Sequence, residues 1–170
     1  MLHLIILGIT SGIIAGLFTH LAFVAEVLPV IVWVAFLGEA TFFAAGGKNK
    51  GFVKGLASNL AGVFWAYLIF MVLATWESQM TMSITVFFVV LFMIAQSKID
   101  ILSFTPGTFI GAAALFGTKS AALPDGEPIG VIIALILGFV MGWAAEKAAD
   151  TIIPLIEKKK TAKIIQEENI

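Results

Sequence analysis

The sequence predicts an all-α integral membrane protein with about six transmembrane helices. Hydrophobic residues make up 60% of the 170-residue chain, and its mean hydropathy is +1.05. Only 12% of the residues are charged, compared with about 25% in soluble globular proteins. Because each span needs about 20 apolar residues, the chain has room for five or six spans and almost no domain outside the membrane.

Other features of the composition exclude particular kinds of site. The absence of cysteine excludes disulfides, thiol catalysis and thiolate metal sites. Every basic residue is lysine, whereas phosphate and nucleic-acid sites usually employ arginine. The sequence also lacks a phosphate-binding loop, a zinc-protease motif and paired intramembrane acids or histidines. We therefore expect no enzyme activity, cofactor, metal site or nucleic-acid partner.

Six apolar segments are separated by polar or turn-forming residues. They cover about 4–24, 28–45, 52–76, 82–95, 101–117 and 129–145. The connection 46–51, G-G-K-N-K-G, combines glycines that can adopt positive φ with lysines that stay in water, so it marks a membrane exit. A second turn is predicted at 124–126, P-D-G. We expect residues 1–147 to form the membrane domain and 148–170 a lysine-bearing cytoplasmic tail.

Glycines recur on the faces of the first and last segments. The first segment has no basic region before it and no convincing cleavage site, which favours a retained helix over a signal peptide. Gly8, Gly12 and Gly16 lie on one face of this helix, where another backbone can approach closely. The partner helix belongs to the same protomer or to another one; a solute-lining face is the alternative. We also assign Gly138 and Gly142 to helix packing.

Two polar residues fall inside predicted spans. A carboxylate at Glu39 costs several kcal/mol in the membrane unless it is protonated, paired or facing water. Glu39 is therefore either a protonatable or solute-coordinating group, or an acid that is hydrogen-bonded to a neighbouring helix or lies near the interface. Asn59 either bridges two helices through hydrogen bonds or contacts a substrate.

The stretch 103–117, S-F-T-P-G-T-F-I-G-A-A-A-L-F-G, combines small residues with an intramembrane Pro-Gly pair. Irregular backbone is tolerated in membranes where it is buried in protein or lines a cavity. We predict that this fifth helix is broken or kinked at Pro106, which frees the carbonyls of Leu102 and Ser103 and places the stretch beside a solute path.

The distribution of lysine tests whether the fifth segment crosses the membrane or re-enters it. Six crossings with the N-terminus inside place nine lysines on the cytoplasmic side and leave only Lys119 outside. A re-entrant fifth segment would carry the lysine-rich tail outside, against the positive-inside tendency. The sequence therefore predicts six crossings, with both termini in the cytoplasm.

A short internal echo points to a repeat. The segment 39–46, E-A-T-F-F-A-A-G, is similar to 106–113, P-G-T-F-I-G-A-A. Each follows an apolar segment and precedes a glycine-bearing one, and three helices per repeat would give a 3+3 repeat of inverted topology. The match is short and consists of common membrane residues, so chance is the alternative.

The T-F-F-A-A-G-G turn at 41–47 and the P-G-T-F-I-G-A-A-A-L-F-G stretch at 106–117 carry a wider resemblance. Together with the glycine-spaced first segment and the third segment containing Asn59, they resemble a family of small bacterial inner-membrane proteins called domain of unknown function 1097. The resemblance covers most of the chain and implies a bacterial cytoplasmic membrane and a compact multi-helix fold. It brings no catalytic or binding residues.

The leading functional hypothesis is a channel or carrier for a small neutral or weakly charged solute. We expect it to act in the lipid bilayer as a homo-oligomer, because a protomer of this size buries little of its own surface. The predicted path consists of polar contacts, a helix break and an apolar constriction: Glu39, Asn59, Thr105, Pro106, Gly107 and Thr108, with Phe42 and Phe109 as the constriction. A proton-coupled carrier is a variant, and a non-transporting scaffold or accessory subunit of a membrane complex is the competing class.

Overall fold

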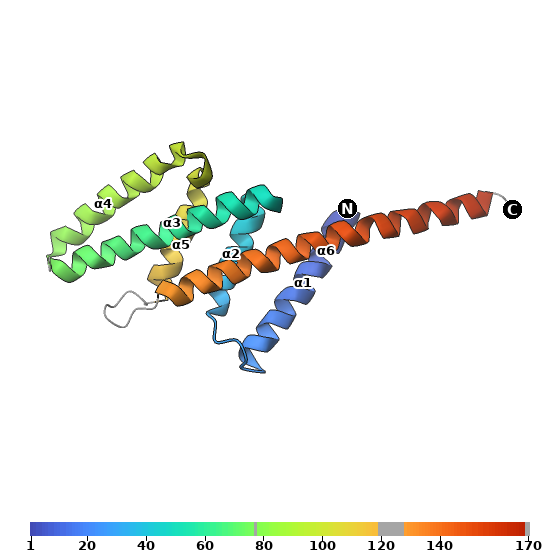
Figure 1. The fold of residues 1–170 in the computed structure, drawn as a ribbon, viewed down its shortest axis with the longest axis horizontal. Coiled ribbons are helices and arrows are strands. Elements are labelled where there is room, and N and C mark those ends of the chain that lie inside the picture. The colour runs from blue at the N-terminus through green and yellow to red at the C-terminus, as the bar shows by residue number, and fades with distance from the viewer. Residues whose placement is uncertain (77, 119–127, 169–170) are drawn as a thin grey trace.

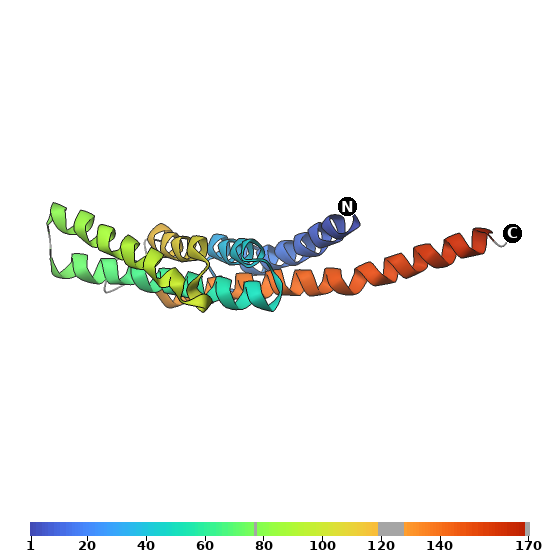
Figure 2. The same ribbon diagram turned by 90° about the horizontal axis from the view of Figure 1, so that it is seen from above.

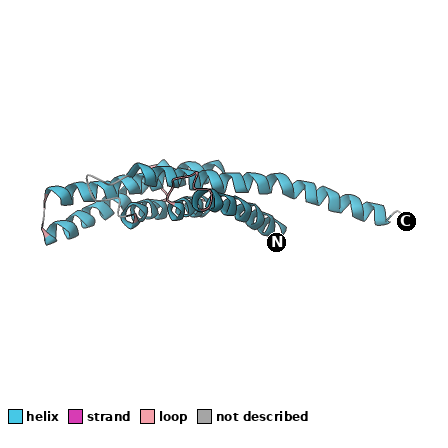
Figure 3. Ribbon diagram, turned by 90° about the horizontal axis from the view of Figure 1, so that it is seen from below, coloured by secondary structure: helices cyan, strands magenta, loops and turns pink. Residues whose placement is uncertain are grey.

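A computed structural model describes residues 1–76, 78–118 and 128–168, and this part of the chain is helical without strands (Figure 1, Figure 3). The all-α prediction is confirmed. The α-helices are α1 (Leu2–Phe23), α2 (Val32–Ala44), α3 (Lys48–Thr75), α4 (Gln79–Ala95), α5 (Thr105–Gly117) and α6 (Pro128–Glu168), and two 3-10 turns, η1 (Gln96–Lys98) and η2 (Asp100–Leu102), connect α4 to α5. The predicted turn at 124–126 and Lys119 lie outside the described residues.

The helices fall into two length classes. Four are long and apolar enough to cross a membrane, namely α1, α3, α4 and α6. In contrast, α2 and α5 have 13 residues each, so each is about 20 Å long at 1.5 Å per residue. That length is shorter than the hydrocarbon core, which is about 30 Å thick. The predicted segments 28–45 and 101–117 are therefore only partly helical.

Each short helix packs across one long helix. The two most extensive helix contacts are those of α2 with α6 and of α5 with α3. Figure 1 shows that α3 and α6 run in opposite directions, as do α2 and α5, and α1 and α4. Seen from above, α1, α2 and α5 form a layer against α3 and α6 (Figure 2). The result is a flat protomer with a thin core.

The core lies where these layers meet. Phe42 and Phe139 are fully buried, and their rings meet edge to face with centroids 6.2 Å apart. The outward faces of α1 and α4 expose large apolar side chains such as Ile13 and Phe87. In water this exposure would be costly, but in a bilayer lipid tails cover these faces.

The turn between α2 and α3 is the tight one predicted from its glycines. Gly46 and Gly47 adopt positive φ values of 103° and 62°, which glycine tolerates without a steric penalty. The Lys48 N–H, at the start of α3, donates a hydrogen bond of 2.6 Å to Glu146 Oε2 on α6. This contact places the start of α3 beside the middle of α6.

Further polar contacts join α1 to α6 and α3 to η2. Thr10 Oγ1 of α1 donates to the Ala145 carbonyl on α6 at 2.9 Å. Lys54 of α3 forms an ion pair with Asp100 of η2. The opposite ends of α2 and α5 also meet, because a Cβ on Gly117 would lie 2.7 Å from the Trp33 ring.

Pro106 starts α5 and does not bend it. The residue lies in the first turn of the helix, where its missing N–H has no intrahelical partner to lose. The Ser103 carbonyl accepts a hydrogen bond from the Thr105 N–H at 3.1 Å, so the prediction that it is free is wrong. The irregular part of the segment 101–117 therefore precedes Pro106, and the predicted kink at this residue is not confirmed.

The helix α6 continues beyond the other helices to the C-terminal end (Figure 1). It is unbroken from 128 to 168 although Pro154 lies inside it. Its helical structure does not change at residue 147, so the division between membrane domain and tail stays a prediction.

Candidate functional site

The crossing of α2 and α6 is built on two glycines that face each other's backbone. A Cβ on Gly138 would lie 1.8 Å from the Ala35 carbonyl oxygen, and a Cβ on Gly38 would lie 2.4 Å from the Leu135 carbonyl oxygen. Gly142 lies one turn further along α6, where its Cβ would be 2.6 Å from the Phe42 ring. The structure thus places Gly138 and Gly142 at helix contacts.

The crossing of α3 and α5 has the same construction. A Cβ on Gly62 would lie 1.9 Å from the Thr108 carbonyl oxygen, and a Cβ on Gly111 would lie 1.9 Å from the Asn59 carbonyl oxygen. Any side chain at these positions would force the two helices apart. The backbones of α3 and α5 are therefore in direct contact.

Two polar side chains of α3 are buried beside this crossing. Ser58 and Asn59 are fully buried, and among the described residues neither Ser58 Oγ nor the Asn59 amide atoms have a hydrogen-bond partner. They face Gly107 in the first turn of α5, where a Cβ would lie 3.1 Å from Ser58 Cβ and 3.3 Å from Asn59 Oδ1. Because Gly107 has no side chain, the unpaired groups of Ser58 and Asn59 lie directly against the first turn of α5.

A hydrogen-bonded chain adjoins these groups. Trp65 Nε1 of α3 donates to Gln96 Oε1 at 2.7 Å, and Gln96 Nε2 donates to Thr108 Oγ1 of α5 at 3.0 Å. The chain ties α3, the end of α4 and α5 together, and it fixes the buried Thr108 hydroxyl. We refer to Ser58, Asn59, Gly107, Thr108 and Gln96 as the polar group.

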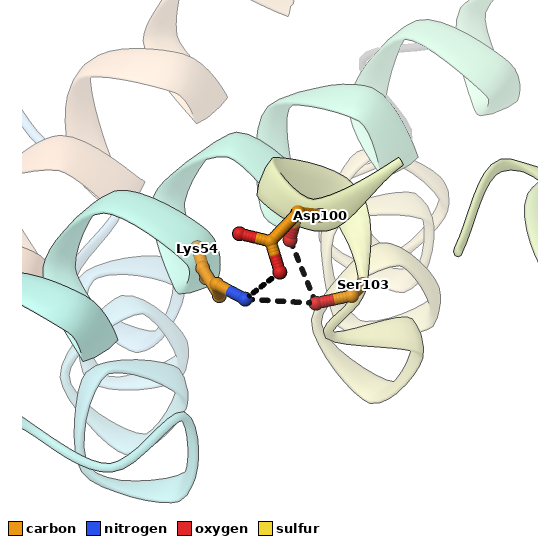
Figure 4. A network of polar contacts seen from close by, with 3 residues as sticks. All are labelled: Lys54, Asp100 and Ser103. Atoms are coloured by element: carbon orange, nitrogen blue, oxygen red, sulfur yellow. Dashed lines mark hydrogen bonds and ion pairs between the residues drawn. The ribbon is translucent and has the colours of Figure 1, made fainter. Parts of the chain in front are cut away.

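A charged network lies at the end of the α3–α5 interface where both helices begin (Figure 4). Lys54, one turn before Ser58 on α3, donates from Nζ to Asp100 and to Ser103 Oγ, the latter at 3.4 Å. Ser103 Oγ in turn donates to the Asp100 carbonyl at 2.7 Å. The hydrogen bond from Lys54, helped by its positive charge, lowers the pKa of Asp100. Asp100 is therefore ionised at neutral pH.

An apolar cavity lies further along the same helices. It has a volume of about 230 Å³ and is lined by α3, α4 and α5, with Ile69, Met93, Phe109 and Phe116 among its walls. The order along the α3–α5 interface is therefore a charged network, the polar group, the glycine crossing and an apolar cavity.

The structure brings only some of the predicted path residues together. Asn59, Gly107 and Thr108 meet in the polar group. Thr105 is half-buried at the start of α5, and Pro106 is exposed beside it.

Glu39 and Phe42 lie in the other half of the protein. The buried Glu39 is at the α2–α6 crossing, where its backbone nitrogen would be 2.8 Å from a Cβ on Gly138, and Ser11 of α1 is its side-chain neighbour. Phe42 packs against Phe139 in the core, whereas Phe109 faces the apolar cavity. The two phenylalanines therefore do not form one constriction.

Gly8, Gly12 and Gly16 make no close helix contact inside the protomer. A Cβ on any of them would meet no atom within 4 Å. The described part of the chain thus gives no support to packing of this face within one protomer, and packing between protomers or a solute-lining face stays a prediction.

Ser58, Gln96 and Trp65 were not predicted to be neighbours of the path. Spacing along α3 could have indicated Ser58 and Trp65, because residues 58, 62 and 65 share one helical face with Gly62 at its centre. Gln96 is separated from α3 by the whole of α4. Its contact with Trp65 therefore depends on how α4 packs against α3, which the sequence pattern does not indicate.

Comparisons with known proteins relate the chain to bacterial inner-membrane proteins. The chain is 34% identical over 157 residues to inner membrane protein YcdZ of Escherichia coli K12, covering 87% of this chain and 91% of the relative. It is 32% identical over 147 residues to inner membrane protein YcdZ of Salmonella typhimurium LT2, covering 85% and 86%. Uncharacterized protein YahC of E. coli K12 is 34% identical over 127 residues, covering 65% and 73%. No solved structure matches the chain.

The family model described as "Protein of unknown function (DUF1097)" matches residues 8–150. This range contains both glycine crossings and the polar group. The four long apolar helices fit the bacterial inner membrane after which the YcdZ relatives are named. The chain is therefore a helical membrane protein that belongs to the DUF1097 family.

Proposed function

We propose that this protein is a membrane carrier for a small neutral solute and that the polar group is its binding site. The observation that carries the proposal is the burial of Ser58 and Asn59 without hydrogen-bond partners among the described residues. Each such buried group costs about 1–3 kcal/mol, and lipid offers no compensating partner. A solute that supplies the missing hydrogen bonds recovers this free energy on binding.

The position of the polar group supports a route along α3. Lys54, one turn before Ser58, is paired with the exposed Asp100, whereas Ala66, two turns beyond Asn59, lines the apolar cavity. A solute would enter past the charged network, bind to the polar group and leave through the apolar cavity.

The glycine crossing favours a carrier over an open channel. The backbones at Gly62 and Thr108 are so close that a Cβ would lie 1.9 Å from the carbonyl oxygen. No solute passes between α3 and α5 in this arrangement, so transport requires the short helix α5 to move relative to α3.

The two crossings also support an inverted repeat of three helices. Residues that make the same glycine–carbonyl contact in the two crossings differ by constant numbers of positions. Ala35 and Thr108, and Gly38 and Gly111, are 73 positions apart, and Asn59 and Leu135 are 76 positions apart. This register differs from the sequence echo, which pairs Thr41 with Thr108. Equivalent helices run in opposite directions (Figure 1), as in transporters whose site lies at paired irregular helices.

The repeat explains why only one half carries the polar group. Ser58 and Asn59 correspond to Ala134 and Leu135, and Thr108 corresponds to Ala35. The three corresponding residues of the α2–α6 half are thus all apolar. The α2–α6 half therefore lacks the hydroxyl and amide groups of the polar group, although Glu39 is buried beside its crossing. We propose that it serves as the scaffold against which the α3–α5 half moves.

We further propose six crossings with both termini in the cytoplasm. The helix α5 begins near the Lys54–Asp100 pair and ends beside Trp33, so it runs from one side of the protein to the other. The non-α-helical residues that precede α2 and α5 lengthen both segments. This added length supports the proposal that each short helix, with these residues, crosses the membrane completely. The lysines at the α2–α3 turn favour the cytoplasmic side for that end.

A scaffold role is the second candidate, and the open glycine face of α1 favours it. Gly8, Gly12 and Gly16 form a surface on which another helix can pack closely. A second copy of the chain would make the homo-oligomer that we expect, and a different membrane protein would make the chain an accessory subunit. Neither assembly uses the polar group, so loss of flux and loss of assembly are separable.

Flux through proteoliposomes tests the carrier proposal. The key variant is Asn59→Leu, because leucine already occupies the equivalent position 135 of the repeat. Asn49→Leu is the matched control, since Asn49 is exposed on the same helix. We expect accelerated flux of a small neutral solute with the wild type and the control, and flux near that of empty vesicles with Asn59→Leu. Equal flux in both variants would contradict the proposal.

A further inference from the structure

We propose that the solute is a small neutral amide, such as urea, formamide or acetamide; this inference rests on the carrier function proposed above. The geometry that points to it is the pairing of an unpartnered carboxamide with an unpartnered hydroxyl on adjacent residues, Asn59 and Ser58. Both face the same glycine, Gly107, across the interface with α5.

The hydrogen-bonding capacity of Asn59 selects the ligand. Its carboxamide offers an acceptor oxygen and an NH₂ donor on one plane. Another primary amide presents the same two groups in reverse, so the two can form a pair of parallel hydrogen bonds. Because this pairing is reciprocal, it holds for either orientation of the Asn59 amide. The Ser58 hydroxyl then donates to or accepts from a third polar atom of the ligand.

Ions fit this site poorly. A carboxylate offers only acceptors and leaves the Asn59 oxygen unpaired, whereas an ammonium ion offers only donors and leaves the Asn59 nitrogen unpaired. The adjacent Lys54 provides no net charge to compensate an ion, because it is paired with Asp100. An ion would also have to leave its water shell at membrane depth.

The close packing at Gly107 favours a ligand of a few heavy atoms. A Cβ on Gly107 would lie 2.8 Å from the Phe104 ring, 3.1 Å from Ser58 Cβ and 3.3 Å from Asn59 Oδ1, so a ligand can enter only if the first turn of α5 moves outward. Urea and acetamide, with four heavy atoms each, require a smaller movement than a larger solute. Polyols such as glycerol also carry donors and acceptors, but a hydroxyl would form both bonds to Asn59 through one oxygen atom, so the two bonds are bent and weaker than the parallel pair formed by an amide.

Stopped-flow light scattering on proteoliposomes compares urea and acetamide with glycerol and acetate, each against protein-free vesicles. We expect urea and acetamide to enter at least about tenfold faster than glycerol after subtraction of the protein-free rates, and acetate to show no acceleration. Asn59→Leu should abolish the amide flux, and Asn49→Leu should preserve it.

Ser58→Ala keeps the inference testable if Asn59→Leu does not fold. This smaller change should reduce amide flux severalfold while the protein elutes as the wild type does and is at least as stable, because a buried hydroxyl without a partner among the described residues is removed. Faster glycerol flux that depends on Asn59 would overturn the amide inference and leave the carrier function intact. No accelerated flux of any solute would overturn both.

Discussion

Gly62 of α3 and Gly138 of α6 occupy equivalent environments in the two halves of the protein. A Cβ on Gly62 would lie 1.9 Å from the Thr108 carbonyl oxygen and 2.8 Å from the Ala112 nitrogen. A Cβ on Gly138 would lie 1.8 Å from the Ala35 carbonyl oxygen and 2.8 Å from the Glu39 nitrogen. One packing solution is thus used twice, each time to seat a short helix on a long one.

Replacement of either glycine should destabilise the fold. In Gly62→Ala and Gly138→Ala the new methyl group overlaps backbone atoms that no rotamer change can move, so we expect a loss of about 1–3 kcal/mol or more. Thermal unfolding in detergent measures the effect. Gly8→Ala is the matched control, because its Cβ meets no atom within 4 Å; equal unfolding temperatures for all three variants would contradict the described crossings.

The Gln96 side chain should stabilise the polar group. Gln96→Leu removes the partner of the Trp65 indole N–H and of the Thr108 hydroxyl, and we expect a cost of about 1–3 kcal/mol because both groups lie inside the protein. The unfolding temperature in detergent checks this. Gln166→Leu, at an exposed position near the end of α6, makes the same change outside this network; a drop of the same size there would show that the network is not responsible.

The ion pair of Lys54 with Asp100 should respond to pH in a defined direction. Lys54 lowers the pKa of Asp100 in the folded protein. The contribution of the pair to stability is therefore complete above the ordinary aspartate pKa and is lost as the pH falls through the lowered folded-state value. A double-mutant cycle with Lys54→Met and Asp100→Asn should show coupling at pH 7 that disappears in acid. Because Asp100 is exposed, we expect the coupling to be small and sensitive to salt.

Glu39 should not be required for passive amide flux. It lies at the α2–α6 crossing, whereas the polar group lies at the α3–α5 crossing. Glu39→Gln keeps the size of the side chain and its capacity to bond with Ser11, so we expect flux within about twofold of the wild type. Flux measured with and without a pH gradient checks the alternative: a gradient-driven component that disappears in Glu39→Gln would identify a proton-coupled carrier.

The open face of α1 should mediate assembly. Gly12→Leu adds bulk where no atom of the same protomer lies within 4 Å, so we expect the protomer to fold normally and the oligomer to dissociate. Chemical crosslinking in membranes and the mass of the detergent complex measure the outcome. Ile133→Leu, on the exposed face of α6, is the control; an unchanged oligomer with Gly12→Leu would place the interface elsewhere.

Several features of the fold could be predicted from the sequence because they depend on local physical chemistry. Hydropathy located each helix, and the Gly46-Gly47 pair marked the turn that its positive φ values now show. The burial of Asn59 followed from its place in an apolar segment. These properties need no knowledge of which helices are neighbours.

Properties that depend on helix pairing were not predictable in this way. The short length of α5 follows from where the chain becomes irregular before Pro106, and hydropathy does not report this. The separation of Glu39 from Asn59 follows from α2 packing on α6 and α5 on α3, a pairing that links helices far apart in the chain. The register of the proposed repeat also differs from the one that the sequence indicates, because the glycine contacts align 35 with 108 whereas the common Thr-Phe pairs align 41 with 108.

If a solute reaches Ser58 and Asn59, a thiol introduced at this site should be accessible to a small labelling reagent. The chain has no cysteine, so Ser58→Cys creates a unique target with nearly the same shape. In proteoliposomes we expect a small methanethiosulfonate reagent to label this position, and excess urea to slow the labelling. Ser83→Cys, exposed on the outer face of α4, should react slowly in lipid and be unaffected by urea. If Ser58→Cys reacts only after denaturation, no route reaches the polar group and this group is not the binding site of a carrier.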